Sequence, residues 1–155
     1  MDESHYRDTY QSINETRCWF EKAINSRKCK CTLMERFNLA DREGVRCSRK
    51  EGQLQCHSWL ETLREKAIFA LQLTRVDGPL PHAKEVKIQL GGMLGVQAAL
   101  DPELAEADTV DDIHASLTDA IQKYGSIEQF PFAEIMQTVV LIEGRTTRRK
   151  DRPKK

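Results

Sequence analysis

The amino-acid sequence predicts an all-α protein, a compact bundle of five or six helices. Apolar residues recur at helical spacing along most of the chain, and capping motifs precede several of these stretches. The segment 84–100 also fits a strand, but the sequence shows no second strand that could pair with it. We expect a single helical domain at 1–144, made of a cysteine-bearing half at 1–75 and a cysteine-free half at 82–144, and then a disordered basic tail at 145–155.

The first helix is expected at about 4–27, because apolar side chains recur there at the spacing of one helical stripe. Arg17 falls on the same stripe, where its long side chain can lie along apolar surface with its charged head in water. The apolar positions are Tyr6, Tyr10, Ile13, Phe20 and Ile24.

Capping boxes predict the next two helices. Thr32–Glu35 predicts a short second helix that ends near Gly44, since the hydroxyl and the carboxylate of such a box bond the free amides of a helix start. Ser48–Glu51 and Ser58–Glu61 both fit the start of the third helix, which continues through the apolar run at 67–71. We favour the earlier start, with Gly52 as a weak point in the first turns. The Gly and Pro residues of VDGPLP, 76–81, then predict a turn and the boundary between the halves.

The segment 84–100 fits both the helical and the strand period, and we assign it as a helix because a lone strand could not satisfy its backbone. Gly91, Gly92 and Gly95 would then form a smooth face that another helix can approach closely. Each glycine costs about 1 kcal/mol relative to alanine within a helix.

Two more helices complete the predicted bundle. The capping box Thr109–Asp112 predicts a helix that Gly125 closes. The last helix is expected to start between Ser126 and Pro131, and the chain then ends in a tail with no apolar residue to bury.

The amino-acid composition limits the cellular location that we expect for the protein and the partners that it can bind. Lys plus Arg and Asp plus Glu both number 24, so no net charge draws the chain to nucleic acid or to a membrane surface. No apolar targeting segment opens the sequence, and no run approaches the roughly 18 apolar residues of a membrane span. We therefore expect a cytoplasmic protein with no membrane partner. In that reducing compartment clustered thiols indicate metal binding or redox chemistry rather than disulfides.

All five cysteines lie between residues 18 and 56, a bias that packing alone does not explain. If the short second helix crosses the first and third helices, all five sulfurs can come within one pocket between them, where four of the five would be ligands. Structural zinc usually takes ligands in C-x2–4-C or H-x3–5-H pairs, and none of the intervals here fits. Ligands gathered from several elements favour an iron–sulfur cluster, [4Fe–4S] or [2Fe–2S], with zinc as the alternative. The candidate ligands are Cys18, Cys29, Cys31, Cys47 and Cys56.

Two other interpretations of the cysteines stay open. Basic residues surround Cys29 and Cys31 next to a predicted helix start, which favours thiolate and would suit a thiol-based redox enzyme as well as an anionic cluster. Buried cysteine also serves as a small apolar side chain. We expect His57 and His82 to contribute less to metal binding than the cysteines do.

The expected function is that of a small protein that binds an iron–sulfur cluster and serves in electron transfer, cluster delivery or redox sensing. The alternative is a zinc-stabilised regulatory or interaction protein whose tail contacts nucleic acid or an acidic partner. No phosphate-binding loop, GxSxG or HExxH motif is present, which favours a non-catalytic protein over an enzyme. The expected partner is another protein. Nucleic acid would be contacted through Arg145, Arg148, Arg149, Lys150, Arg152, Lys154 and Lys155.

Overall fold

The computed structural model describes the backbone of residues 3–71 and 80–150, and the side chains of these residues up to Ile142. Most of this chain is helical, as predicted, but a β-hairpin breaks the all-α assignment. The elements are α1 (Glu3–Ile13), α2 (Glu21–Asn25), β1 (Met34–Leu39), β2 (Arg42–Cys47), α3 (Lys50–Ala70), α4 (His82–Leu100), α5 (Ile113–Tyr124) and α6 (Phe132–Lys150), with short 3₁₀ turns at Pro102–Leu104 and Ile127–Gln129.

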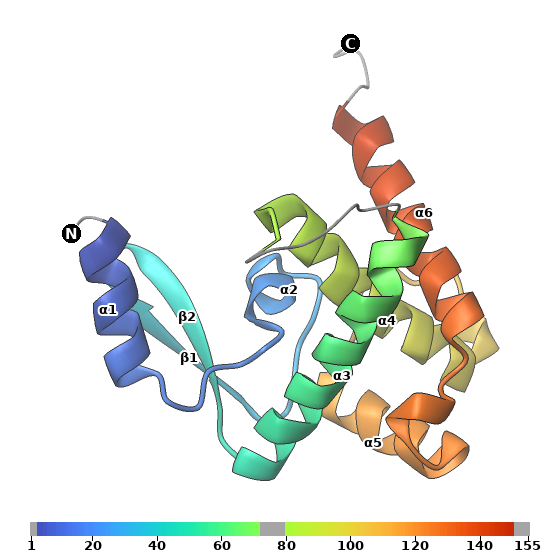
Figure 1. Cartoon of the computed structure of the whole chain (residues 1–155), viewed down its shortest axis with the longest axis horizontal. Helices are drawn as coiled ribbons and strands as arrows, with labels where there is room; N and C mark the ends of the chain where they lie inside the picture. Colours follow the sequence, from blue (N-terminus) through green and yellow to red (C-terminus); the bar gives the residue numbers. More distant parts are fainter. Residues whose placement is uncertain (1–2, 72–79, 151–155) are drawn as a thin grey trace.

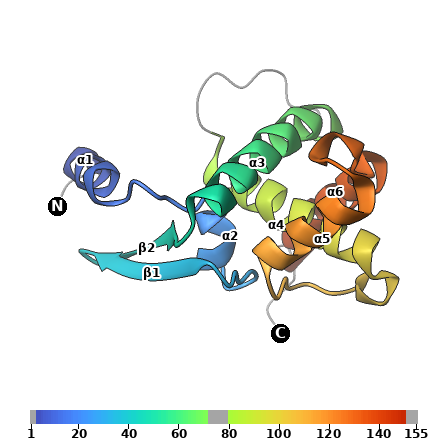
Figure 2. The same ribbon diagram turned by 90° about the horizontal axis from the view of Figure 1, so that it is seen from below.

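Two views of the chain show the same division of the molecule (Figures 1 and 2). Helix α1 and the β1–β2 hairpin lie at one end, helices α3 to α6 lie at the other, and α2 lies between them. Helix α4 is central, since it packs against α2, α3, α5 and α6. Its residues from Lys87 to Gln97 are all buried, which explains why its sequence is apolar on nearly every side.

The glycines of α4 form the close helix contact that the sequence predicts. A Cβ atom on Gly91 would lie 2.6 Å from Cα of Val139, and one on Gly95 would lie 2.9 Å from Cα of Ile135. The backbones of α4 and α6 therefore touch along a stripe of i, i+4 spacing. Residues with a side chain at either position would push the two helices apart.

A polar network joins α4 to the cysteine-bearing half. Buried Glu85 of α4 accepts hydrogen bonds from Arg64 of α3 and from Gln89 one turn further along α4. Gln89 in turn accepts a hydrogen bond from the amide of Ala23 in α2 (3.1 Å). These bonds satisfy polar groups that would be costly to bury alone.

The single helix expected at 4–27 is wrong. Helix α1 ends at Ile13, none of its residues is buried, and α2 does not begin until Glu21. Residues 16–18 pair with β2, because the amide of Cys18 bonds the carbonyl of Val45 (3.0 Å) and the amide of Cys47 bonds the carbonyl of Thr16 (2.7 Å). Tertiary pairing thus overrides the helical periodicity of this stretch.

The second helix expected after Thr32 is also wrong, since β1 and β2 form an antiparallel hairpin there. In its register Phe37 lies opposite Gly44, and a Cβ atom on Gly44 would lie 2.3 Å from the tip of the Phe37 ring. The aromatic ring covers the glycine across the strands, a contact that a helix could not make. The condition that a short helix should cross the others therefore does not apply.

The remaining helices agree with the sequence except at their ends. The helix expected from Ser48–Glu51 is confirmed as α3, and the ambiguous segment 84–100 is confirmed as helical in α4. Helix α5 is capped by Asp112, whose carboxylate accepts the amide of Ala115, so the start expected at Thr109 is three residues too early. Gly125 closes α5 with a φ of 96°, as predicted.

The predicted tail and the predicted boundary between the halves lie partly outside the residues that the structure describes. Helix α6 is drawn to Lys150 and 151–155 lie outside the described residues, so the disordered tail expected at 145–155 stays a prediction. Of the boundary at 76–81, only Leu80 and Pro81 are described. Across the described helices, none is both long enough and apolar enough to cross a membrane.

Candidate functional site

Four of the five cysteines line one cavity. Cys18, Cys31, Cys47 and Cys56 come from four separate segments and meet around a space of about 20 Å³. All are free thiols. The rest of the wall is mainly apolar and includes Trp19, Phe20, Leu33, Met34, Ile113 and His114.

The open end of the hairpin brings three of the four cysteines together. Met34 and Cys47 are partners in the register, and the amide of Met34 bonds the carbonyl of Cys31 (3.2 Å). On the other side of β2, the segment that ends in Cys18 pairs with Val45 and Cys47. Because the hairpin turns the chain back on itself, cysteines 16 residues apart, Cys31 and Cys47, lie at the same end.

Helix α3 supplies the fourth cysteine and leaves room beside it. Cys56 lies in the second turn, and Gly52 lies one turn earlier on the same face. A Cβ atom on Gly52 would lie 2.7 Å from Cδ1 of Leu33 and 3.5 Å from Sγ of Cys47. The missing side chain therefore contributes to the space between the thiols.

The cysteine-free half closes the cavity. The amide of Lys30 bonds the carbonyl of Val110 (3.0 Å), and the amide of Ile113 bonds the carbonyl of Lys30 (2.9 Å). Asp112, the N-cap of α5, also accepts the amide of Thr32 (3.1 Å). These bonds hold the segment around Cys31 against the first turn of α5.

Backbone amides are directed at two of the sulfurs. The amide of Phe20 donates to Sγ of Cys18, and the amides of Leu33 and His114 donate to Sγ of Cys31, and each of these bonds lowers the pKa of its thiol. The His114 amide belongs to the first turn of α5, where free N–H groups carry the positive end of the helix dipole. Hydrogen bonds of this kind stabilise thiolate and also tune metal–sulfur centres.

Burial outweighs these bonds as long as no cation is present. It raises the pKa of Cys18 to about 12 and also raises the pKa values of Cys31 and Cys56, and the neighbouring thiols act in the same direction. Reactive cysteines need a low pKa, so this environment works against a thiol-based redox enzyme. A bound metal cation reverses the balance, because it deprotonates its thiol ligands.

Cys29 and the two histidines lie outside the cavity wall. Cys29 is buried beside Val110, its bridge partner, and burial alone raises the pKa of its thiol to about 12. His57 stacks on Trp19 with ring centroids 4.2 Å apart and pairs with Glu61 (3.0 Å). His82 is the first residue of α4 and is exposed.

Sequence reasoning missed two residues of this wall. Gly52 stands out in the sequence only as a weak point near a helix start, since its role in making space depends on contacts with Leu33 and Cys47. His114 lies in the other half of the chain, and no motif links it to the cysteines. Spacing of cysteines alone could not have found either.

The thiols do not form a ready-made ion site. Over the part of the chain that is described, no three His, Cys, Asp or Glu side chains are grouped so that they could hold a metal ion. Sγ of Cys47, for example, donates to the carbonyl of Arg49 (3.1 Å). Comparison with known proteins adds no assignment, since no family model, curated protein or solved structure matches the chain.

Proposed function

We propose that this protein binds an iron–sulfur cluster through Cys18, Cys31, Cys47 and Cys56, and serves in electron transfer, cluster delivery or redox sensing. One observation carries the proposal: four thiols from four separate segments line a single cavity, while the fifth cysteine lies elsewhere. Four cysteine thiolates are the usual ligands of both [2Fe–2S] and [4Fe–4S] clusters.

The spacing of the four thiols supports a cluster over a single ion. Structural zinc typically takes pairs of ligands from one tight turn, and no two of these cysteines share a turn. The amides directed at Cys18 and Cys31 would stabilise the negative charge of a cluster with four thiolates. The first turns of α3 and α5 border the same cavity and add the positive ends of two helix dipoles.

Binding requires the thiols to rearrange, because the described residues do not group them as metal ligands. A cysteine side chain rotates about one bond, and a strained rotamer costs about 1 kcal/mol. This cost is small beside the roughly 10–16 kcal/mol that binding of structural zinc contributes in small domains. A cluster is larger than the present cavity, so Leu33 and Met34 would have to move outward. Methionine is flexible and repacks at low cost.

Zinc is the second candidate, and the cavity volume favours it. About 20 Å³ accommodates a water-sized body, which is the scale of one ion. Four thiolates at about 2.3 Å could then close around zinc in a tetrahedron.

Anaerobic purification of the whole chain distinguishes the two metals. A cluster gives a brown sample that absorbs near 400 nm and contains iron and acid-labile sulfide in equal amounts. Colourless protein with one zinc per chain would support the second candidate, and folded protein free of metal would contradict both.

Single Cys→Ser variants test the ligand set, and Cys29→Ser is the matched control. We expect substitution of any of the four cavity cysteines to lower the iron and sulfide content several-fold. Cys29→Ser should keep the wild-type content, because Cys29 is buried away from the cavity. Equal metal content in all five variants would show that thiolates do not hold the metal.

A further inference from the structure

Helices α3 and α6 leave an apolar groove between them. Figures 1 and 2 show the C-terminal end of α3 lying beside α6. The groove there is open and has a volume of about 520 Å³, which is ample for an aromatic side chain. The residues that line it carry no charge, and they are Ala70, Ala133, Met136, Gln137, Val140 and Leu141. The two helices therefore expose apolar surface along their line of contact.

Phe69 projects beside this groove and is 90% exposed. Nζ of Lys66, one turn earlier in α3, lies 5.0 Å from the ring centre of Phe132, the first residue of α6, so this side of α3 faces α6. Residues three apart are neighbours on a helix surface, which places Phe69 next to Lys66 at the edge of the groove. Val140 and Leu141 of the groove wall are exposed as well. Three of the six large apolar side chains that are exposed in the described part of the chain thus gather in one patch, and such patches mark interaction sites.

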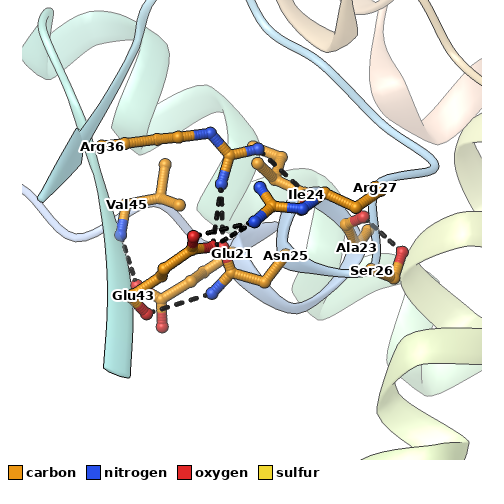
Figure 3. A network of polar contacts seen from close by, with 9 residues as sticks. All are labelled: Glu21, Ala23, Ile24, Asn25, Ser26, Arg27, Arg36, Glu43 and Val45. Atoms are coloured by element: carbon orange, nitrogen blue, oxygen red, sulfur yellow. Dashed lines mark hydrogen bonds and ion pairs between the residues drawn. The ribbon is translucent and has the colours of Figure 1, made fainter. Parts of the chain in front are cut away.

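Two exposed charges lie at the edge of this patch, Lys66 of α3 and Glu134 of α6, which directly follows a residue of the groove wall. Neither takes part in the ion pairs found between described residues. Charges near the hairpin are instead neutralised within the chain, since Figure 3 shows Glu43 of β2 paired with Arg27 (2.8 Å) and Arg36 (3.5 Å). The edge of the patch therefore offers one cation and one carboxylate to a partner.

We propose that this patch is the interface of a symmetric homodimer, in which Phe69 of each copy enters the groove of the other. Because the projecting ring and the groove lie in the same patch, one two-fold axis satisfies both contacts at once, as in isologous interfaces. The charges suit the same symmetry, since Lys66 of each copy can pair with Glu134 of the other. A net charge of zero adds no repulsion between copies. The dimer does not depend on a bound metal, because the groove and the cysteine cavity share no lining residue.

The area of the contact predicts a weak dimer. A buried aromatic side chain removes about 150–250 Å² from water, and the groove wall that receives it loses a similar area. Two reciprocal contacts would therefore bury roughly 600–1,000 Å² in total, at the low end of interface sizes, where association is weak and transient. We expect a dissociation constant on the order of 10 µM.

Sedimentation equilibrium of the full chain tests the dimer, in a reducing buffer so that disulfides between copies do not form. The average mass should rise from one chain towards two as the protein concentration increases. Phe69→Ser should raise the dissociation constant about a hundredfold, because each of the two buried rings contributes at least a factor of ten. Leu54→Ser is the matched control, since Leu54 is an exposed apolar residue of the same helix that does not line the groove. It should leave the dissociation constant within about twofold.

Two further measurements locate the interface. In a mixture of isotope-labelled and unlabelled chains, NMR should show nuclear Overhauser effects between the Phe69 ring of one copy and the methyl groups of Val140 and Leu141 of the other. Lys66→Glu should weaken the dimer, and adding Glu134→Lys to it should restore the affinity.

A chain that stays monomeric up to about 300 µM, far above the expected dissociation constant, would overturn the proposal and leave the groove to other residues of the chain or to another protein. Association that Leu54→Ser weakens as much as Phe69→Ser would also overturn it. So would a dimer in which the Phe69 ring shows no contact with the other copy.

Discussion

The two ends of the molecule are held together by different forces. At the α4–α6 contact, glycines let two backbones touch, and apolar side chains such as Ile135 and Val139 are fully buried. At the cysteine cavity, segments without regular structure are joined by single backbone bonds, and the cysteines of the hairpin and of α3 are only half-buried. The α4–α6 contact is stabilised by close packing of two helices, whereas the cysteine cavity also depends on these backbone bonds between irregular segments.

The difference indicates where a bound metal would matter for folding. A two-stranded hairpin is only marginally stable by itself, and α1, which lies beside it, buries no residue. Ligands from four segments would tie together the parts that packing holds least well. A metal centre would then be structural for the cysteine end and irrelevant to the α4–α6 end.

Removal of the metal is expected to have the largest effect and tests this contrast directly. Binding of structural zinc contributes roughly 10–16 kcal/mol in small domains, so its loss should lower the local stability of the cavity segments by several kcal/mol. Amide hydrogen exchange should become much faster at Cys18 and Cys47, whose amides bond between these segments, and at Met34, whose amide bonds the carbonyl of Cys31. Exchange in α4 and α6 should change little.

The double variant Cys47→Ser/Cys56→Ser should reproduce this pattern without a chelator, and Cys29→Ser should not. Faster exchange spread evenly over both ends would mean that the molecule unfolds as one unit and that the contrast is wrong.

Gly91→Ala is the next largest change and affects the other end. Its Cβ would lie 2.6 Å from Cα of Val139, which cannot move without shifting α6. Overpacking of this kind costs about 1–3 kcal/mol, or a fall in Tm of roughly 2–4 °C per kcal/mol for a chain of this size. Thermal unfolding of the metal-loaded protein measures it, and metal content should stay constant.

Gly92→Ala is the matched control, because both glycines are buried in the same helix and both gain helix propensity on substitution. The new Cβ there meets the end of the Leu63 side chain rather than a backbone atom. If Gly92→Ala destabilises the protein as much as Gly91→Ala, backbone contact is not what holds α4 to α6.

The same contrast explains which parts of the fold the sequence could predict. Helix α4, with its glycine face, follows from residues a few positions apart, and so does the closure of α5 by Gly125. The hairpin does not, because Phe37 covers Gly44 and residues 16–18 add to β2 only after the chain has folded back. Local capping at Thr32–Glu35 suggested a helix that these longer-range contacts exclude.

The sequence could predict the candidate site only as far as its chemistry follows from the type of residue present, which is cysteine. The confinement of all five cysteines to one half pointed to a shared role, but spacing could not identify which one stands apart. That depends on the bridge between Cys29 and Val110, which turns Cys29 into the core while Cys31 lines the cavity. Whether the thiols bind a metal stays a prediction.

Gly52→Ala should have a smaller and more specific effect, on metal retention rather than on folding. The new methyl group would lie 2.7 Å from Cδ1 of Leu33 and would narrow the cavity, while helix propensity improves by about 1 kcal/mol. We expect unchanged or slightly higher thermal stability without metal, and faster loss of iron to a chelator. Gln55→Ala in the same helix is the control, since Gln55 does not line the cavity. Equal rates of loss in the two variants would remove Gly52 from the site.

The smallest expected effect concerns α1, the least firmly held element. Arg42 of β2 bonds Glu3 (2.6 Å) and holds the pKa of that carboxyl below its usual value near 4.5. A lowered pKa in the folded state means that the pair stabilises α1 docking above the unfolded pKa, and that this contribution is lost as the pH falls through the folded pKa. The Tyr6 ring lies 4.3 Å from the Arg42 guanidinium, so its NMR signals should shift as the pH falls below about 4.5. Both partners are half-exposed, so the effect is small and salt weakens it. In Glu3→Gln the Tyr6 signals should lose this pH response; if they keep it, another group governs the docking of α1.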